Sequence, residues 1–299
     1  MVLIQQQQTA LLPASKTKIC NNVKSGAHAP LFFSTMKIFI YIIFITFSYS
    51  AHIKAEVQFS IAPSLLFFDY TEFNFNGSEL NNETGTIPGI QLNLNTTINS
   101  HLDIKLSIAG YDGNVNYDGY TQFGSAIATT TDENIFRYSM HISTPLLNNA
   151  NIFLSTTFHQ WKRDIQGKGT VLGIFEKYQW REVSIGINTI FWTNEQGSWL
   201  AEAALLKTVN PEMYIDLSEA DLGSTNLNLG TDTGARFQLS WVAKNTSNQN
   251  YGFSIFFETW DFGISDSNTT SGGTTSVSVY EPRSETRHSG IQFIVGFHY

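Results

Sequence analysis

Apolar and polar residues alternate along most of the chain beyond residue 56. The pattern is clearest in residues 290–299, where every second side chain is aliphatic or aromatic: Ile291, Phe293, Val295, Phe297 and Tyr299. A period of two residues is the signature of a β-strand whose two faces meet different surroundings. Alternation of this length suits a wall with hydrocarbon on one side and a mostly polar lumen on the other.

Twelve segments with this alternation can be counted, separated by compact and by long polar connections. They cover residues 57–70, 89–97, 103–114, 134–143, 151–163, 171–179, 183–191, 199–208, 212–218, 235–244, 251–258 and 290–299. Most are as long as the roughly 9–11 residues that a membrane-spanning strand needs. We therefore predict an all-β fold, a transmembrane antiparallel up-and-down β-barrel of about twelve strands. A soluble β-sandwich or a lipocalin-like barrel is the competing interpretation.

The first 55 residues differ from the rest. Lys37 precedes an apolar run at residues 38–47 and then the small residues Ser48, Ser50, Ala51 and Ala55. The run is too short for a spanning helix, so residues 36–55 are predicted to be a signal peptide. Residues 1–35 are interpreted as a dispensable extension or a miscalled start, and residues 56–299 as the barrel domain.

Charge and cysteine content exclude several functions. Residues 1–55 contain five Lys and no acid, so residues 56–299 keep 12 basic and 25 acidic side chains, a formal charge of 12 − 25 = −13. So acidic a chain is a poor nucleic-acid binder. Cys20 lies in the extension, which leaves the barrel without a disulfide or a thiolate metal site. We expect no metal site and no cofactor.

The parity of the strands assigns charged side chains to the lumen. These predicted lumen residues are Lys105, Arg137, His141, His159, Glu202, Glu212, Asp216, Arg236 and Glu258. A barrel of about twelve strands has a lumen narrower than that of the 16- to 18-stranded porins. Charges of both signs could therefore line a small aqueous path or form ion pairs that fill the interior. Eight acids on the predicted outer loops would favour cations: Glu72, Glu79, Glu83, Asp118, Asp132, Glu133, Glu219 and Asp221.

The residues on either side of the last long loop form the most distinctive sequence motif of the chain. Trp260 and Ser265-Asp266 precede it, and Glu281-Pro282-Arg283 with Thr286 follows it. This motif resembles that of a functionally uncharacterised group of proteobacterial outer-membrane β-barrels. The sequence around Tyr70, Glu83-Thr84-Gly85 and Pro88-Gly89 is also similar to that group. The resemblance implies the outer membrane of a Gram-negative bacterium but no reaction. The alternating charges around this loop predict a cluster of ion pairs at the rim of the barrel, which either holds neighbouring strands together or contacts lipopolysaccharide. The predicted rim cluster consists of Asp261, Asp266, Glu281, Arg283, Glu285 and Arg287.

The carboxyl-terminal strand also resembles the final strand of bacterial outer-membrane barrels, which the insertion machinery reads. The predicted insertion signal consists of Phe293, Val295, Phe297 and Tyr299. The expected partners are therefore outer-membrane lipids, lipopolysaccharide, the barrel-insertion machinery and small cations or solutes. The expected function is a narrow channel for ions or small solutes, or a structural and surface-contact barrel.

An enzyme that hydrolyses membrane lipids or peptides is the alternative function. His141 and Ser143 have the His-x-Ser spacing of lipid A deacylases, and His159 and His288 could pair with acids as in omptin-like proteases. No Asn follows the serine, the sequence places no orienting carboxylate beside it, and no Asp-Asp pair accompanies the histidines. We therefore predict no catalytic residues.

Overall fold

The computed structural model describes residues 3–6, 56–99, 101–121, 124–244, 249–272 and 275–298. The predicted signal peptide, most of the predicted extension and Tyr299 lie outside the described residues. Of the extension, only β1 (Leu3–Gln6) is described, and its backbone pairs antiparallel with β13 (Thr275–Tyr280). In the described residues, no helix is long and apolar enough to cross a membrane.

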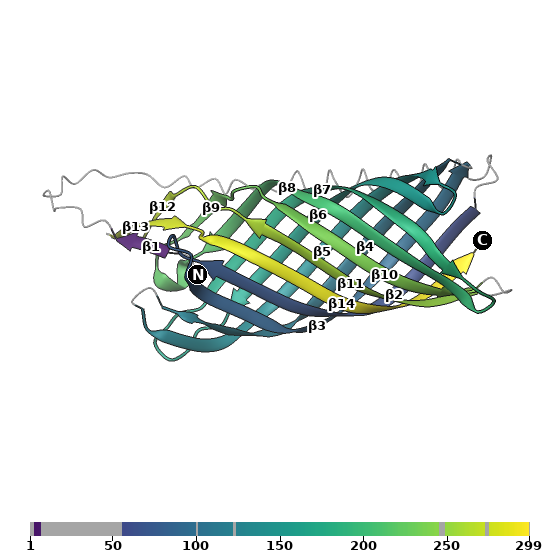
Figure 1. The fold of residues 1–299 in the computed structure, drawn as a ribbon. Coiled ribbons are helices and arrows are strands. Elements are labelled where there is room, and N and C mark those ends of the chain that lie inside the picture. Colours follow the sequence, from purple (N-terminus) through teal and green to yellow (C-terminus); the bar gives the residue numbers. More distant parts are fainter. Residues whose placement is uncertain are drawn as a thin grey trace, which may run out of the picture. The chain divides into compact units, whose positions relative to one another are not determined.

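Ten antiparallel strands form a closed barrel in the described part of the chain (Figure 1). They are β2 (Glu56–Phe73), β3 (Glu79–Asn99), β4 (Leu102–Tyr120), β5 (Ala126–Leu147), β6 (Ala150–Ile165), β7 (Ile174–Thr193), β8 (Gly197–Asp216), β10 (Thr233–Ala243), β11 (Gln249–Phe262) and β14 (Arg283–His298). Each pairs with the next, β8 pairs with β10, and β14 pairs with β2 to close the wall. The up-and-down barrel is confirmed, with ten strands instead of the predicted twelve.

Two pairs of predicted strands are each one strand. Residues 174–179 and 183–191 lie in β7, and residues 199–208 and 212–216 lie in β8. In β8 a β-bulge explains the error, because Gln179 pairs with Glu212 while Arg181 pairs with Val209. Two residues of β8, Asn210, whose φ is 47°, and Pro211, face the single residue Trp180 of β7, so β8 has one extra residue here. This pair has the composition of a strand end, but the strand continues through it.

The strands are longer than a bilayer requires. β5 has 22 residues, which at about 3.3 Å per residue exceeds 70 Å, against a hydrocarbon core of about 30 Å. Most of the predicted loops at residues 71–88 and 115–133 are therefore strand. The turn between β2 and β3 is confined to the few residues around Gly77, where the φ of 82° suits glycine.

The outer surface of the barrel divides into two halves. The terminal half, which holds Glu56 and His298, has an apolar surface that includes Leu65, Phe67, Ile90, Leu92, Ile142, Leu154, Val183, Ile185, Ile187, Leu205, Phe237, Phe253, Ile255, Phe257 and Phe293. The distal half has polar residues at the corresponding outward positions, among them Asp69, Thr84, Asp112, Asn114, Asn116, Asp132, Lys162, Asp164, Arg181 and Arg287. An apolar band of this kind is the part of a barrel wall that meets lipid.

The interior shows the opposite division. On β6, Ser155 and Thr157 face inward in the terminal half, and Trp161 and Ile165 face inward in the distal half. A cluster of buried apolar side chains fills the distal half. The distal half thus has the packed core of a soluble protein, while the terminal half has the polar interior of a membrane barrel.

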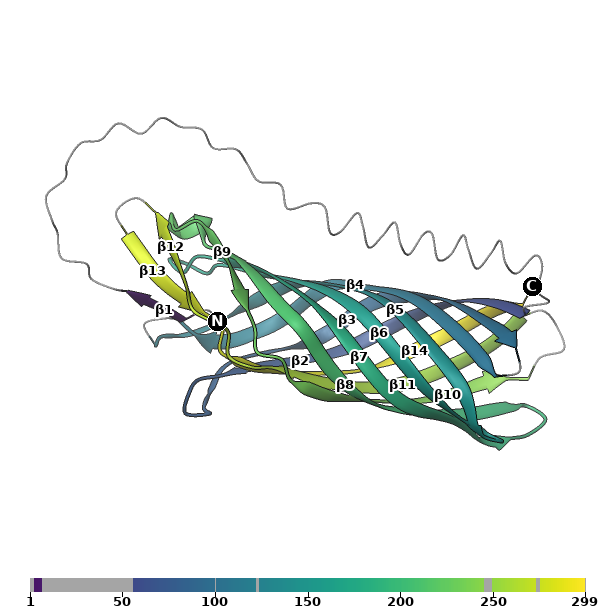
Figure 2. The ribbon, with the colours of Figure 1, turned by 90° about the horizontal axis from the view of Figure 1, so that it is seen from above.

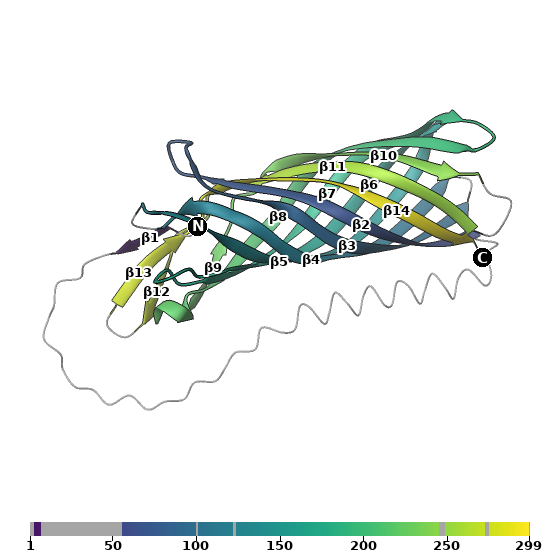
Figure 3. The ribbon, with the colours of Figure 1, turned by 90° about the horizontal axis from the view of Figure 1, so that it is seen from below.

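Short elements cover the distal end of the barrel (Figures 2 and 3). They are η1 (Ser218–Ala220), β9 (Ser224–Asn228), β12 (Asn268–Gly272) and β13. β9 extends the wall beside β8, and Asn268 Nδ2 of β12 donates to the Asn226 carbonyl of β9 at 2.8 Å. Val277 and Val279 of β13 belong to the distal core, so the hairpin β12–β13 packs on the barrel.

Candidate functional site

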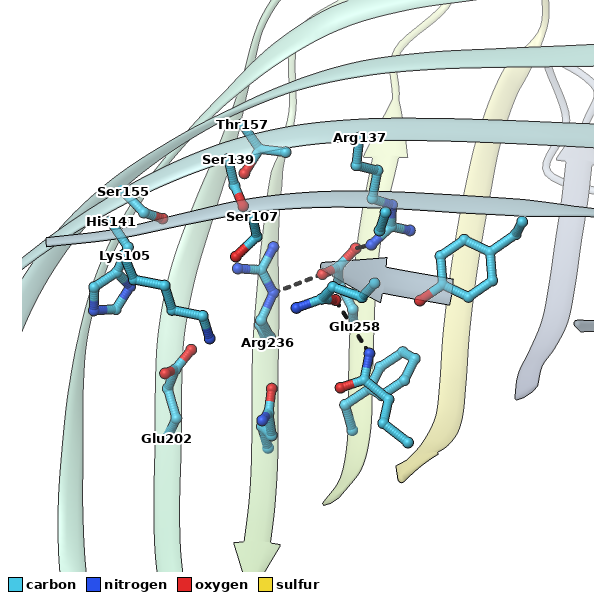
Figure 4. Close-up of a pocket in the computed structure, with 16 residues that line it drawn as sticks. Lys105, Ser107, Arg137, Ser139, His141, Ser155, Thr157, Glu202, Arg236 and Glu258 are labelled. Atoms are coloured by element: carbon cyan, nitrogen blue, oxygen red, sulfur yellow. Dashed lines mark hydrogen bonds and ion pairs between the residues drawn. The ribbon is translucent and has the colours of Figure 1, made fainter. Parts of the chain in front are cut away.

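Most of the predicted lumen residues meet inside the barrel. Lys105, Arg137, His141, Glu202, Arg236 and Glu258 line one cavity, shown in Figure 4. His159 is fully buried and contacts Glu182 nearby. The same parity would have placed Glu182 in the lumen, because it faces inward with Tyr178 and Trp180 on β7.

The prediction that Glu212 and Asp216 face the lumen is wrong. Glu212 is exposed and Asp216 is half-buried, while Met213 and Ile215 between them are fully buried. The bulge at Asn210 shifts the parity of β8: even-numbered residues face inward before it and odd-numbered residues after it. A slip of one residue moves every later side chain to the other face.

The cavity lies in the terminal half and is polar. Its volume is about 100 Å³, enough for several waters but smaller than ordinary ligand pockets of about 300–1,000 Å³. Figure 4 shows Lys105 and His141 at one side and the Arg137–Glu258 pair at the other. Ser107, Ser139, Ser155 and Thr157 also line the cavity. Gly89 makes room for the Tyr111 ring at the edge, since a Cβ on Gly89 would lie 2.2 Å from that ring.

A chain of ion pairs closes the distal side of the cavity. The Glu258 carboxylate accepts from Arg137 Nη1 at 3.0 Å and from Arg236 Nε at 2.6 Å. Arg236 Nη2 continues to Glu182 at 2.9 Å, and His159 Nε2 lies 3.4 Å from the same carboxylate. Because the charges alternate in sign and are hydrogen-bonded, they are tolerated in a closed interior.

The candidate catalytic histidines are part of this packing. His159 stacks on Trp180 with ring centres 4.4 Å apart, and His288 Nδ1 lies 2.8 Å from Arg137 Nη2. His141 stacks on Phe153 at 4.2 Å. No hydrogen bond joins His141 to Ser143 in the described residues, so this arrangement offers no activated serine.

A second charged layer lies deeper in the distal half, centred on Arg163. Its guanidinium contacts Glu72 at 3.3 Å, Glu83 at 2.5 Å and Glu176 at 2.7 Å, and its carbon lies 4.2 Å from the Tyr70 ring centre. All of these side chains are fully buried. Sequence reasoning placed Glu72, Glu83 and Glu133 on outer loops, but they are strand residues that face inward. Arg163 itself could have been found by extending the parity of His159 along β6.

Aromatic rings fill the space around the two charged layers. Trp161 stacks on Tyr178 at 4.9 Å and meets Tyr70 edge-on at 5.1 Å. Trp180 lies 5.8 Å from Trp260. The hydroxyl groups of Tyr70 and Tyr178 both donate to Glu281, at 3.3 and 2.7 Å. The distal interior is therefore a solid mixture of rings and buried charges.

The predicted rim cluster forms in part. Arg283 lies 3.0 Å from Glu285 and 3.9 Å from Asp261, and Arg287 lies 3.1 Å from Glu285. Glu281 does not share this outward face, because the chain between β13 and β14 turns its side chain into the core. Asp266 accepts instead from Asn228, at 2.9 Å from the backbone amide and 2.7 Å from the side chain. The cluster clasps β11 to β14, and Asp266 clasps the hairpin to β9.

Asp261 should make the stability of the barrel depend on pH. Partial burial and the neighbouring Glu285 and Asp232 carboxylates raise the pKa of Asp261 to about 6. An acid with a raised folded-state pKa favours the folded state below its unfolded pKa, and this advantage is lost as pH rises through about 6. Asp261→Asn should therefore stabilise the barrel more at about pH 7 than at about pH 4. Urea midpoints at the two pH values measure this, with Asp112→Asn as the exposed control; an equal change at both would contradict it.

The predicted insertion signal is described except for its last residue. Phe293 is exposed on the apolar outer surface, and Val295 and Phe297 follow it on the same face. Within the described residues, no group of three or more His, Cys, Asp or Glu side chains is arranged to hold a metal ion.

Comparison with solved structures finds outer-membrane β-barrels. The outer membrane protease OmpT from Escherichia coli aligns over 82% of this chain and 96% of its own, with 9% identity and a TM-score of 0.54. The translocator domain of the autotransporter NalP from Neisseria meningitidis aligns over 81% and 88%, with 8% identity and a TM-score of 0.43. The Pseudomonas putida toluene transporter TodX aligns over 81% and 90%, with 9% identity and a TM-score of 0.33.

The similarity to OmpT establishes the fold class alone. No protein-family model and no curated protein matches the chain. At 9% identity, the similarity to OmpT shows a barrel of the outer-membrane type and transfers no activity.

Proposed function

We propose that this protein is an outer-membrane β-barrel of a Gram-negative bacterium that is closed through its interior and acts as a structural and surface-contact barrel. One observation carries this proposal: large, fully buried side chains cross the distal half from all around the wall. They include Leu66, Tyr70, Ile87, Ile135, Trp161, Arg163, Tyr178, Met213, Ile215, Leu227, Trp260 and Phe262. Their strands are β2, β3, β5, β6, β7, β8, β9 and β11.

The two halves support this placement. The apolar surface of the terminal half suits lipid, and Trp192, Trp199 and Trp241 lie side by side near its edge, as in the aromatic girdles of membrane barrels. The polar outer surface of the distal half suits water. With both ends of the barrel wall, at Glu56 and His298, on the periplasmic side, the distal half projects from the cell, where lipopolysaccharide and external molecules can contact it.

A channel function fits this interior less well. The Arg137–Glu258–Arg236 ion pairs and the Arg163 layer lie one above the other, and the cavity beneath them is only about 100 Å³. A path for solutes would have to break both layers. An enzyme is also less well supported, because His159 and His288 are occupied by ion-pair and aromatic contacts.

Planar-bilayer recordings test the closed barrel. The purified protein should show no steady unitary conductance, because large buried side chains fill the distal core. Trp180→Ala combined with Trp260→Ala should introduce a leak, since both rings fill the space between the charged layers. Five of the acids predicted on outer loops are exposed and should make that leak cation-selective: Glu79, Asp118, Asp132, Glu219 and Asp221. Regular conductance steps from the unchanged protein would overturn the proposal and favour the channel.

A further inference from the structure

The outward charges of the distal half are distributed unevenly around the barrel. On β2 to β5, the described side chains of this half that are charged and face outward are acidic, among them Asp69, Asp112, Asp118 and Asp132. β6, β7 and β8 lie side by side in the wall (Figure 2). Their outward basic side chains, which we call the basic surface, are Lys162, Lys177, Arg181 and Lys207. This surface stands out because 25 acidic side chains outnumber 12 basic ones in residues 56–299.

Two lysines of the basic surface are directly opposite each other. Lys162 on β6 pairs with Lys177 on β7, and both side chains face outward. Opposite residues have Cβ atoms about 4.5–5.5 Å apart, so like charges in these positions repel each other. Lys177 Nζ lies 5.6 Å from the Tyr214 ring centre, which is a cation–π contact and not a neutralising one.

The other two bases lie at the border of the apolar surface. Arg181 pairs with Val209 and Lys207 pairs with Val183, so the two bases are diagonal neighbours, about 7–8 Å apart. Both are exposed. The apolar outer surface begins beside them, because Phe158 lies opposite Arg181 and Val183 lies opposite Lys207.

Few acids lie among these bases. Asp164 and Asp216 both pair with Phe175, which places them beyond the opposed lysines and farther from the apolar surface. Glu212, which pairs with Gln179, lies between the lysines and Arg181.

In the described part of the chain, no ion pair joins an acid to any of the four bases. Four bases and one acid therefore occupy the outer wall of β6 to β8 between the apolar surface and the opposed lysines. This part of the wall has positive charge that the protein itself does not neutralise.

We propose that the basic surface binds the phosphate groups of one lipopolysaccharide molecule, whose acyl chains lie on the adjoining apolar surface. This inference rests on the proposed position of the distal half outside the cell. A guanidinium binds phosphate through two parallel hydrogen bonds and an ammonium binds it as a point charge. Bases at the border of an apolar surface match a molecule whose anionic head continues into acyl chains, whereas a soluble anion would use the bases alone.

The extent of the basic surface favours a head with more than one phosphate. Arg181 and Lys177 are four residues apart on β7, which at about 3.3 Å per residue is about 13 Å. Lipopolysaccharide has several phosphate groups on a large sugar head, so one molecule can reach both pairs of bases. A phospholipid with a single phosphate can neutralise one pair at a time.

The bases of the rim cluster are less suited to this contact. Arg283 lies 3.0 Å from Glu285, and Arg287 lies 3.1 Å from the same carboxylate. A lipid phosphate would have to compete with that carboxylate. Arg283 and Arg287 therefore provide a matched control, because they are outward bases of the same half that already have a partner.

Thermal unfolding in detergent micelles tests the proposal. The protein is refolded from urea without lipid and then mixed with lipopolysaccharide, with dephosphorylated lipopolysaccharide or with phosphatidylglycerol. Lipopolysaccharide should raise Tm by several degrees, because a ligand that binds only the folded state stabilises it. The shift should shrink as salt rises, and it should be much smaller with the other two lipids. An equal shift from phosphatidylglycerol would overturn lipopolysaccharide as the occupant.

Lys162→Gln combined with Lys177→Gln is the diagnostic variant, and Arg283→Gln combined with Arg287→Gln is the control. Each removes two positive charges from the outer wall. Without lipid, the diagnostic variant should have a Tm at least as high as that of the unchanged protein, because the repulsion between the lysines is gone. It should lose most of the shift caused by lipopolysaccharide, whereas the control should keep it.

Two results from these variants would overturn the proposal. One is a full lipopolysaccharide shift in the diagnostic variant. The other is an equal loss in both variants, which would show a general attraction between the lipid and any base. Neither result bears on the closed interior, which the planar-bilayer recordings test separately, so failure of this inference and failure of the proposed function are distinguishable.

Discussion

Replacing Arg163 by Met should destabilise the barrel by about 3–5 kcal/mol, the cost of leaving buried charges without their partner. Arg163 is fully buried and contacts Glu72, Glu83 and Glu176. Met fills much of the same volume, so the loss should arise from the uncompensated carboxylates and not from a cavity. Urea unfolding followed by tryptophan fluorescence measures the change, because Trp161 contacts the guanidinium.

Arg287→Met provides the control for this experiment. Arg287 is exposed and pairs with Glu285, and an exposed ion pair contributes only about 0–1 kcal/mol. Lowering the pH should partly rescue Arg163→Met, because protonation of the carboxyl groups removes the charge that the variant leaves unpaired. Equal effects of the two variants would show that the Arg163 layer does not stabilise the core.

Replacing Phe253 by Arg should cost about 2–4 kcal/mol, as a charge near the bilayer midplane does on the lipid face of a barrel. Phe253 and Ile255 face outward on β11 within the apolar surface, while Ser254 between them is fully buried, as the alternation predicts. The fraction of protein that resists extraction from isolated outer membranes, and the refolded fraction in lipid vesicles, both report the effect.

The structure changes the control for Phe253→Arg. Ser254 faces the lumen but donates to Gln292 at 3.1 Å in a closed space, so an arginine there would test crowding as well as charge. Asn116 is the better control position, since it is exposed and outward on β4 in the distal half. Asn116→Arg should insert normally. If it failed as Phe253→Arg does, the boundary between the apolar and polar surfaces would be misplaced.

Strand alternation predicted the barrel because side-chain polarity alternates with a period of two residues wherever one face of a strand contacts water and the other does not. The strand count failed where backbone detail overrides composition. Asn210-Pro211 was interpreted as a strand end, but β8 absorbs it as a bulge. Nothing in the local sequence distinguishes a bulge from a turn, because both favour the same residues. The wrong placement of Glu212 and Asp216 follows from that one error.

The distal core was missed for a different reason. On β6 the inward positions change from Ser155 and Thr157 to Trp161, while the outward positions change from Leu154 to Lys162 and Asp164. The same alternate residues face inward along the whole of β6, but the inward face changes from polar to apolar and the outward face from apolar to polar. A search for one apolar face therefore stops at the reversal and assigns the remaining residues to loops, which is how Glu72, Glu83 and Glu133 came to be placed outside.

Because polarity reverses along each strand, the outer surface of the terminal half suits lipid and that of the distal half suits water. Urea acts on surface that becomes exposed to water, and opening the distal half would expose an aromatic core to water, whereas the terminal half keeps its apolar side in lipid throughout. Local unfolding in proteins proceeds in cooperative units of unequal stability. We expect the distal half to be such a unit, which opens like a small soluble domain while the terminal half of the same ten strands stays folded.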